Sequence, residues 1–234
     1  MVGRSPADRH GPLRWTLVLV VVYLLIPTPA RGQYVDLRIF GGPSITSMNG
    51  DYVESATETW GFTGGAAVAW HISRRFMLEG AFATIQKGGW TVVAAGETEP
   101  FDYRFGYTEI PILLTVLFPL SGDDWVFGVF GGGAPSFGGA CSVKPVTQHA
   151  FKDCTADTPG GELESFDAVV MFGVKMDRVF TGGSGFGFDA KFSQGTQNVL
   201  TGAADEGLSA KNFGFDVKLR IWLPLGGPRQ VESP

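Results

Sequence analysis

The chain has 234 residues, including 34 glycines and 19 phenylalanines, and a formal net charge of −5. This length suits one domain, and many glycines and aromatic residues with few charges favour an all-β protein over a helical bundle. The negative charge argues against a nucleic-acid partner, because no basic face is available to neutralise phosphates.

Residues 1–32 are predicted to form a secretory signal peptide. Arginines 4, 9 and 14 precede the uncharged apolar stretch 15–26, and small residues at 30 and 32 come before Gln33. That stretch is shorter than the roughly 20 residues of a membrane helix, and no longer apolar run follows it. An exported chain without such a helix is either a soluble protein or a β-barrel of an outer membrane.

The rest of the sequence alternates between apolar and polar or small residues with a period of two. A helix would scatter the charges around its circumference, whereas a strand separates them onto one face. The final segment is the clearest, because Phe213, Phe215 and Val217 alternate with Gly214 and Asp216. In chain order, the alternation predicts strands over residues 34–40, 60–72, 76–86, 106–118, 125–133, 166–176, 185–193 and 213–223.

The fourth of these segments, "GYTEIPILLTVLFPL" (106–120), contains a proline and a carboxylate within an apolar run. At period two, one face is wholly apolar and the other contains Glu109 and Pro111. Pro111 lacks an N–H donor but is tolerated at irregular pairings. We therefore expect a strand whose apolar residues point outward and whose carboxylate points inward.

The connections between these segments alternate in length. Short connections are expected at 73–75, 121–124 and 177–185, and long ones at 43–59, 88–102, 141–162 and 194–210. In an up-and-down meander this places all long loops at one end, as in outer-membrane barrels. The predicted fold is all-β: an eight-stranded antiparallel up-and-down transmembrane β-barrel over residues 33–224, followed by a tail at 225–234.

In a membrane barrel the apolar face of each strand contacts lipid and the charged face lines the interior. Aromatic residues near strand ends suggest interfacial girdles: Trp60, Trp70, Tyr107, Phe118, Trp125 and Trp222. The residues expected to face lipid are Ile110, Ile112, Leu114, Val116, Phe118, Phe213, Phe215, Val217, Leu219 and Ile221. The charges expected in the lumen are Asp36, Arg38, Glu79, Glu109, Asp167, Lys175, Asp189, Lys191, Asp216, Lys218 and Arg220.

The near balance of these inward charges predicts a salt-bridged plug rather than a pore, since eight strands enclose a space that side chains fill. Glu79 and Glu109 are expected to pair with inward lysines or Arg220 rather than to act as a catalytic pair. His71 is expected to be a solvated residue of a short turn. The sequence therefore predicts no enzyme, no cofactor and no metal site.

Cys141 and Cys154 lie in the longest expected loop. In an oxidising compartment a disulfide between them is expected, and it would contribute on the order of 3 kcal/mol by closing a loop of about 14 residues. Two free thiols, or metal ligation together with His149, are the alternatives.

Two stretches, "FMLEGAFATIQKGG" (76–89) and "YRFGYTEIPILLTVLFPL" (103–120), give the chain a family resemblance. Together with "VFGVFGGGAPSFGG" (126–139) and "KNFGFDVKLRIWLP" (211–224), they resemble the outer-membrane β-barrel domain of the PorT-like group. The resemblance implies a monomeric eight-stranded barrel that the outer-membrane assembly machinery inserts; most members have no assigned activity. Such barrels usually end on an aromatic residue, whereas "PLGGPRQVESP" extends past Trp222 here.

The leading functional expectation is a non-enzymatic barrel of the bacterial outer membrane with a structural or surface-interaction role. Its acidic external loops could contact divalent cations, lipopolysaccharide-bound ions or a partner: Asp51, Glu54, Glu58, Glu97, Glu99, Asp205 and Glu206. The alternatives are a narrow, porin-like channel for small solutes or ions and a soluble lipocalin-like carrier of hydrophobic ligands.

Overall fold

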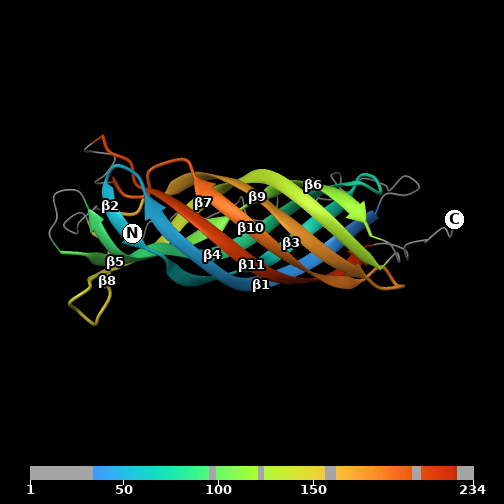
Figure 1. The fold of residues 1–234 in the computed structure, drawn as a ribbon, viewed down its shortest axis with the longest axis horizontal. Coiled ribbons are helices and arrows are strands. Elements are labelled where there is room, and N and C mark those ends of the chain that lie inside the picture. Colours follow the sequence, from blue (N-terminus) through green and yellow to red (C-terminus); the bar gives the residue numbers. More distant parts are fainter. Residues whose placement is uncertain (1–33, 95–98, 121–123, 156–161, 202–206, 226–234) are drawn as a thin grey trace, which may run out of the picture. The chain divides into compact units, whose positions relative to one another are not determined.

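The computed structural model describes residues 34–94, 99–120, 124–155, 162–201 and 207–225. The expected signal peptide, Glu97, Asp205, Glu206 and the tail after Leu225 lie outside these residues. The described part is almost entirely β-structure (Figure 1), and none of its helices is long and apolar enough to span a membrane. Its strands are β1 (Tyr34–Asn49), β2 (Val53–Thr57), β3 (Thr59–His71), β4 (Phe76–Ala94), β5 (Phe101–Glu109), β6 (Ile112–Pro119), β7 (Trp125–Pro145), β8 (Lys152–Asp153), β9 (Phe166–Val179), β10 (Gly185–Gly195) and β11 (Lys211–Leu225).

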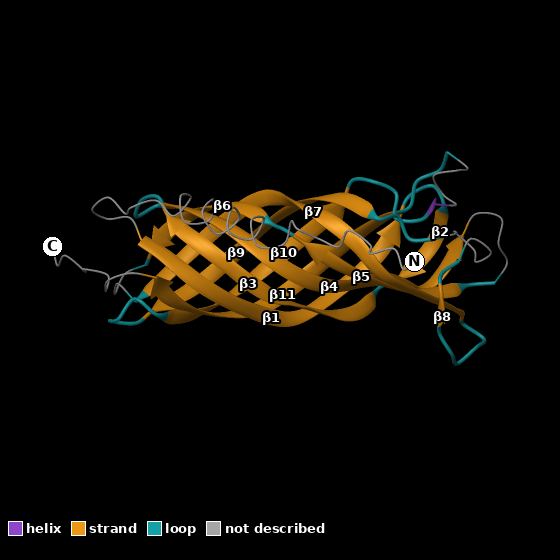
Figure 2. Ribbon diagram, turned by 180° about the vertical axis from the view of Figure 1, so that it is seen from behind, coloured by secondary structure: helices purple, strands orange, loops and turns teal. Residues whose placement is uncertain are grey.

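The strands form one antiparallel sheet that closes on itself. From β1 the hydrogen-bonded neighbours run through β3, β4, β5 with β6, β7, β9, β10 and β11, and β11 pairs again with β1. The closing seam is long and in register, from Val35 opposite Leu225 to Asn49 opposite Lys211, with a gap at residues 42 and 43. Figure 2 shows the tilted strands wrapped around a common interior, with β2 and β8 at one end. The expected antiparallel up-and-down order is therefore present.

Strands β5 and β6 follow one another along the chain and pair with β7 in the same register. Glu109 of β5 pairs with Ser136 of β7 and Ile112 of β6 with Gly133, so the offset against β7 is the same on both sides of Pro111. The Ala81 amide of β4 donates to the Pro111 carbonyl at 3.0 Å. The return bond cannot form because proline has no N–H. The proline thus removes one hydrogen bond without shifting the chain.

The expected loop lengths need correction, and the assigned strands are more numerous than the eight expected. The described residues form eleven strands rather than eight, because β5 and β6 are separated at Pro111 and because β2 and β8 form within expected loops. In addition, β1, β4 and β7 continue well into the segments expected to be loops. These extensions are held by cross-strand bonds, such as Ser47 opposite Phe213, where hydrophobic alternation has ended.

At the end of the sheet where the long connections lie, the interior is apolar. We call this set of buried residues the apolar cap: Met48, Tyr52, Ile85, Val92, Phe101, Tyr103, Phe105, Tyr107, Val143, Val199, Leu200 and Ala210. On the same part of β5, Arg104 is exposed on the outer face. The inward-facing side chains therefore change in character along the strands: they are charged along most of the sheet and aromatic at this end.

Candidate functional site

Charged side chains fill the interior below the apolar cap. All eleven residues expected in the lumen are buried, each with no more than 6% of its surface exposed. Three further buried side chains, His71, Lys87 and Asp177, belong to the same interior. All of these residues except Asp167 form two groups, each connected by ion pairs.

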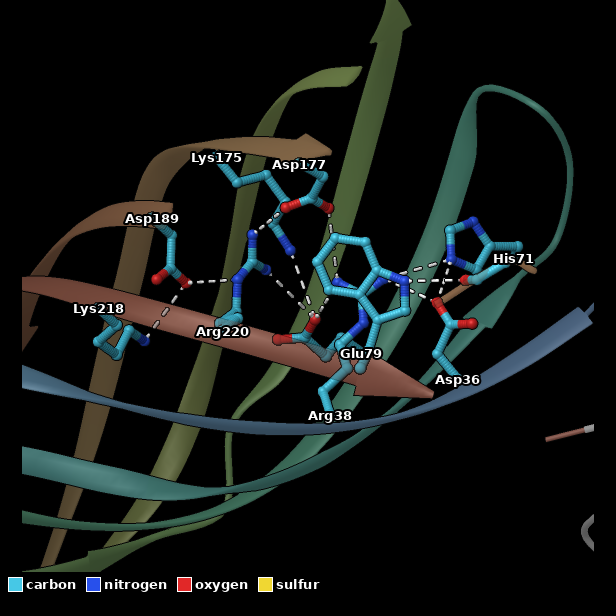
Figure 3. Close-up of polar contacts among 11 residues, drawn as sticks. Asp36, Arg38, His71, Glu79, Lys175, Asp177, Asp189, Lys218 and Arg220 are labelled. Atoms are coloured by element: carbon cyan, nitrogen blue, oxygen red, sulfur yellow. Dashed lines mark hydrogen bonds and ion pairs between the residues drawn. The ribbon is translucent and has the colours of Figure 1, made fainter. Parts of the chain in front are cut away.

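The lower ion-pair group surrounds Glu79 and is shown in Figure 3; it comprises Asp36, Arg38, His71, Glu79, Lys175, Asp177, Asp189, Lys218 and Arg220. The Glu79 Oε2 atom lies 3.3 Å from Arg38 Nη1 and 3.4 Å from Lys175 Nζ. Arg220 Nη1 is 3.9 Å from the same oxygen. One carboxylate from β4 thus connects cations from β1, β9 and β11 across the interior.

Shorter contacts surround this centre. Arg220 Nη2 donates to Asp177 Oδ1 at 2.6 Å, and Arg38 Nη2 donates to Asp36 Oδ2 at 3.0 Å. His71 Nε2 lies 2.9 Å from the same Asp36 oxygen. The group contains four carboxylates and four lysine or arginine side chains, so its formal charges balance when His71 is neutral. Buried charges are tolerated when they are paired in this way.

The upper ion-pair group contains Lys87, Glu109, Lys191 and Asp216. Lys87 Nζ lies 2.6 Å from Glu109 Oε1, and Lys191 Nζ lies 2.9 Å from Asp216 Oδ2 and 3.8 Å from Glu109 Oε2. These four charges also balance. Glu79 and Glu109 are thus both held by cations, as their expected roles required.

Asp167 is held differently, by main-chain groups. Its Oδ1 atom accepts hydrogen bonds from the amides of Thr196 and Gln197, each at 3.1 Å. The side chain lies against Gly195, where an added Cβ atom would collide with Asp167 Oδ2. This carboxylate therefore fixes the end of β10 and the segment that follows it.

Sequence reasoning placed His71 in solvent, and it did not include Lys87 or Asp177. His71 lay near the end of its expected strand, Lys87 just past the end of the next one, and Asp177 in an expected connection. In the structure β3 ends at His71 with this side chain buried, and β4 and β9 continue past Lys87 and Asp177. The signal was the continuing period of two, since Asp177 follows Lys175 and His71 follows Ala69 on the inward face. His71 also stacks on Tyr34, with ring centroids 3.9 Å apart.

The opposite face of the strands exposes apolar residues. Of the ten residues expected to contact lipid, eight expose 41–58% of their surface, and Val116 and Phe213 are half-buried. The expected aromatic girdles need correction at Tyr107 and Trp222, which are buried. Trp222 packs on the Arg38 guanidinium at 5.2 Å, and Tyr107 lies under Lys87 Nζ at 5.0 Å. Both positions alternate in step with the inward-facing residues of their strands. This places the two rings in the interior although they lie near a strand end.

The expected disulfide between Cys141 and Cys154 is present, so the alternatives of free thiols and metal ligation do not apply to these residues. It joins the end region of β7 to the residue after β8, with Cα atoms 5.4 Å apart. The bridge therefore closes the hairpin that contains β8. Within the described ranges, no three His, Cys, Asp or Glu residues are arranged to hold a metal ion.

Comparisons with known proteins identify similar structures but no family. No protein-family model matches the chain, and no characterised protein matches it by sequence, so the PorT-like assignment stays a prediction. The fold is similar to the attachment invasion locus protein Ail of Yersinia pestis in complex with the heparin analogue sucrose octasulfate, with 11% identity and a TM-score of 0.44 over 81% of this chain and 99% of that one. It is also similar to Neisserial surface protein A, with 9% identity and a TM-score of 0.46 over 81% and 98% of the two chains.

Proposed function

We propose that this chain is a non-enzymatic β-barrel protein of a bacterial outer membrane, with a plugged interior and a structural or surface-interaction role. One observation supports this most directly: the closed sheet exposes its apolar side chains and buries its charges. That is the arrangement lipid requires, because water would favour the opposite one.

The barrel is best counted as eight-stranded. Strands β5 and β6 share one register and act as a single wall element, while β2 and β8 lie outside the ring of pairings. The remaining members of the ring are β1, β3, β4, β7, β9, β10 and β11. Eight strands enclose an interior that side chains can fill, and the two ion-pair groups and the apolar cap fill this one.

The exposed apolar face supports the membrane location. Ile39, Phe172 and Ile221 are each more than half exposed, and they lie on β1, β9 and β11. A contiguous band of such side chains would be an aggregation hazard in water. The same exposure opposes the soluble lipocalin-like alternative, which needs these residues inside. The barrel would be a monomer whose partners are outer-membrane lipid and, during insertion, the assembly machinery.

The filled interior opposes the channel alternative. Two spaces among the charged residues are each no bigger than a single water molecule. In the usual orientation the short turns face the periplasm and the long connections face outward, so the apolar cap closes the outer end. We therefore assign the role to the surface, where the exposed acidic residues Asp51, Glu54 and Glu58 lie near β2. We propose that they contact divalent cations or a partner, and removing these loop residues should abolish that binding.

The test of the proposal is membrane fractionation followed by gel electrophoresis of heated and unheated samples. We expect the processed chain in the outer-membrane fraction, with a faster-migrating folded form that converts to the unfolded form on boiling. A soluble periplasmic protein of the same host serves as the fractionation control. Recovery of the folded chain from the aqueous periplasmic extract would overturn the proposal.

A further inference from the structure

A small cavity lies between the two ion-pair groups, at the level of Pro111. Its volume, taken as the space open to the centre of a water molecule, is about 10 Å³. This is about the size that one water molecule needs. The lining includes the charged side chains Glu79, Asp189, Lys191, Lys218 and Arg220 on one side and Ala81, Ala83 and Pro111 on the other.

The ion pairs in which both partners line this cavity are long. Arg220 lies 3.9 Å from Glu79 and 3.8 Å from Asp189, and Lys218 lies 3.5 Å from Asp189. Arg220 makes a shorter pair, at 2.6 Å, with Asp177, which does not line the cavity. Polar contacts longer than about 3.5 Å are the ones that a water molecule commonly bridges.

Several buried polar atoms at this cavity lack a hydrogen-bond partner among the described residues. They are Arg220 Nε, Arg220 Nη1 and Asp189 Oδ1, in side chains that are at least 96% buried. The Ala81 carbonyl also loses its cross-strand donor because its partner residue is Pro111. Arg220 supplies donors and Asp189 an acceptor beside one water-sized space, which provides two of the two to four partners of a buried water.

We propose that this cavity is a binding site for one internal water molecule. The water accepts from the Arg220 guanidinium and donates to the Asp189 carboxylate. Since Lys191 lines the same cavity and belongs to the upper ion-pair group, the water joins the two groups into one network. The site does not depend on the location of the protein, so its failure would leave the proposed function intact.

The test is a high-resolution crystal structure of the refolded barrel and of its Ala81→Val variant. In the wild type we expect a water within hydrogen-bond distance of Arg220 and Asp189, and in the variant the added methyl groups should displace it. A wild-type cavity without water, with Arg220 and Asp189 in direct contact, would overturn the proposal.

The effect of Ala81→Val on stability is an independent test, because it has opposite signs for a cavity that holds water and for an empty one. Displacing a bound water leaves buried polar groups unpaired, so Ala81→Val should raise the unfolding equilibrium constant about tenfold or more. Filling a dry cavity should lower it. The matched control is Ala134→Val, at a buried alanine among apolar neighbours that does not line the cavity. A loss for Ala81→Val that does not exceed the control's would contradict the water site.

Discussion

Identical residue types have opposite roles on the two faces of each strand. Glu79 is buried with three cations around one of its oxygens, whereas Glu54 is exposed on β2. Leu113 packs in the interior, whereas Leu219 of β11 is nearly half exposed. Whether a residue is buried or exposed follows from whether its position along the strand faces inward or outward. The effect of a substitution therefore depends on that direction more than on the residue type.

Replacing Glu79 with glutamine should destabilise the barrel strongly. The substitution removes one charge from a buried, balanced group and leaves Arg38 and Lys175 without their shared carboxylate. Breaking a buried pair in this way costs about 3–5 kcal/mol. Urea unfolding of the refolded protein in lipid vesicles measures the loss. Glu54→Gln is the control, and a similar midpoint for the two variants would contradict the ion-pair assignment.

Replacing Leu219 with lysine should impair insertion. Leu219 lies near the middle of the outward row of β11, and a lysine on the lipid face costs about 2–4 kcal/mol at the bilayer midplane. We expect a smaller heat-modifiable fraction in outer-membrane preparations. Leu219→Ala controls for the lost side-chain volume. Equal folded yields of the lysine and alanine variants would indicate that this face meets water.

At the scale of single elements, two features modify a regular sheet. Pro111 interrupts one hydrogen bond while β5 and β6 keep a common register. The hairpin with β8 is the other feature, because its short strand pairs with β7 at Ser142 and Val143 and is closed by the disulfide. The first is a local defect inside the wall, and the second is an appendage at the end of the wall.

Substituting Pro111 with alanine should slow amide exchange in the neighbouring part of β4. The new N–H can donate to the Ala81 carbonyl, and a hydrogen bond of this kind contributes about 0.5–1.5 kcal/mol. Hydrogen-exchange mass spectrometry of β4 peptides measures the effect. Pro119→Ala, at the end of β6, is the matched control. Unchanged amide exchange around Ala81 would contradict a stabilising hydrogen bond from the new N–H to the Ala81 carbonyl.

Removing the disulfide should loosen the hairpin but not the barrel. In a double Cys141→Ser, Cys154→Ser variant, the lost constraint on a loop of this size corresponds to about 3 kcal/mol. We expect faster proteolysis between residues 141 and 154, with the heat-dependent gel shift retained. Loss of that shift would show that the bridge is needed for the whole fold.

The described part of the molecule combines two kinds of core. Within the ring of strands the paired charges lie among small apolar clusters, such as Leu113 with Phe130, and at the end with the long connections the buried groups are aromatic and aliphatic. Both lie in the interior, and the two spaces found among the charged residues are each about the size of one water molecule. The proposed plugged interior rests on this arrangement.

Purified protein in planar lipid bilayers should therefore show no stable single-channel conductance. The physical reason is that an ion would have to displace the paired charges of both groups and then cross the apolar cap. A porin reconstituted under the same conditions is the positive control. Discrete, reproducible conductance steps from the folded protein would refute the plugged interior and favour the channel alternative.

The sequence alone determined the strands and their faces, because side chains alternate with a period of two wherever one face is apolar. Asp216, Lys218 and Arg220 could be assigned inward, and Leu219 and Ile221 outward, from that period alone. Tertiary structure decided where strands end and which charges meet. The limits of β1 and β4 depend on hydrogen bonds to neighbouring strands, which no local pattern records. Likewise, Glu79 meets Arg38, Lys175 and Arg220 only because closure of the sheet brings β1, β4, β9 and β11 around one narrow interior.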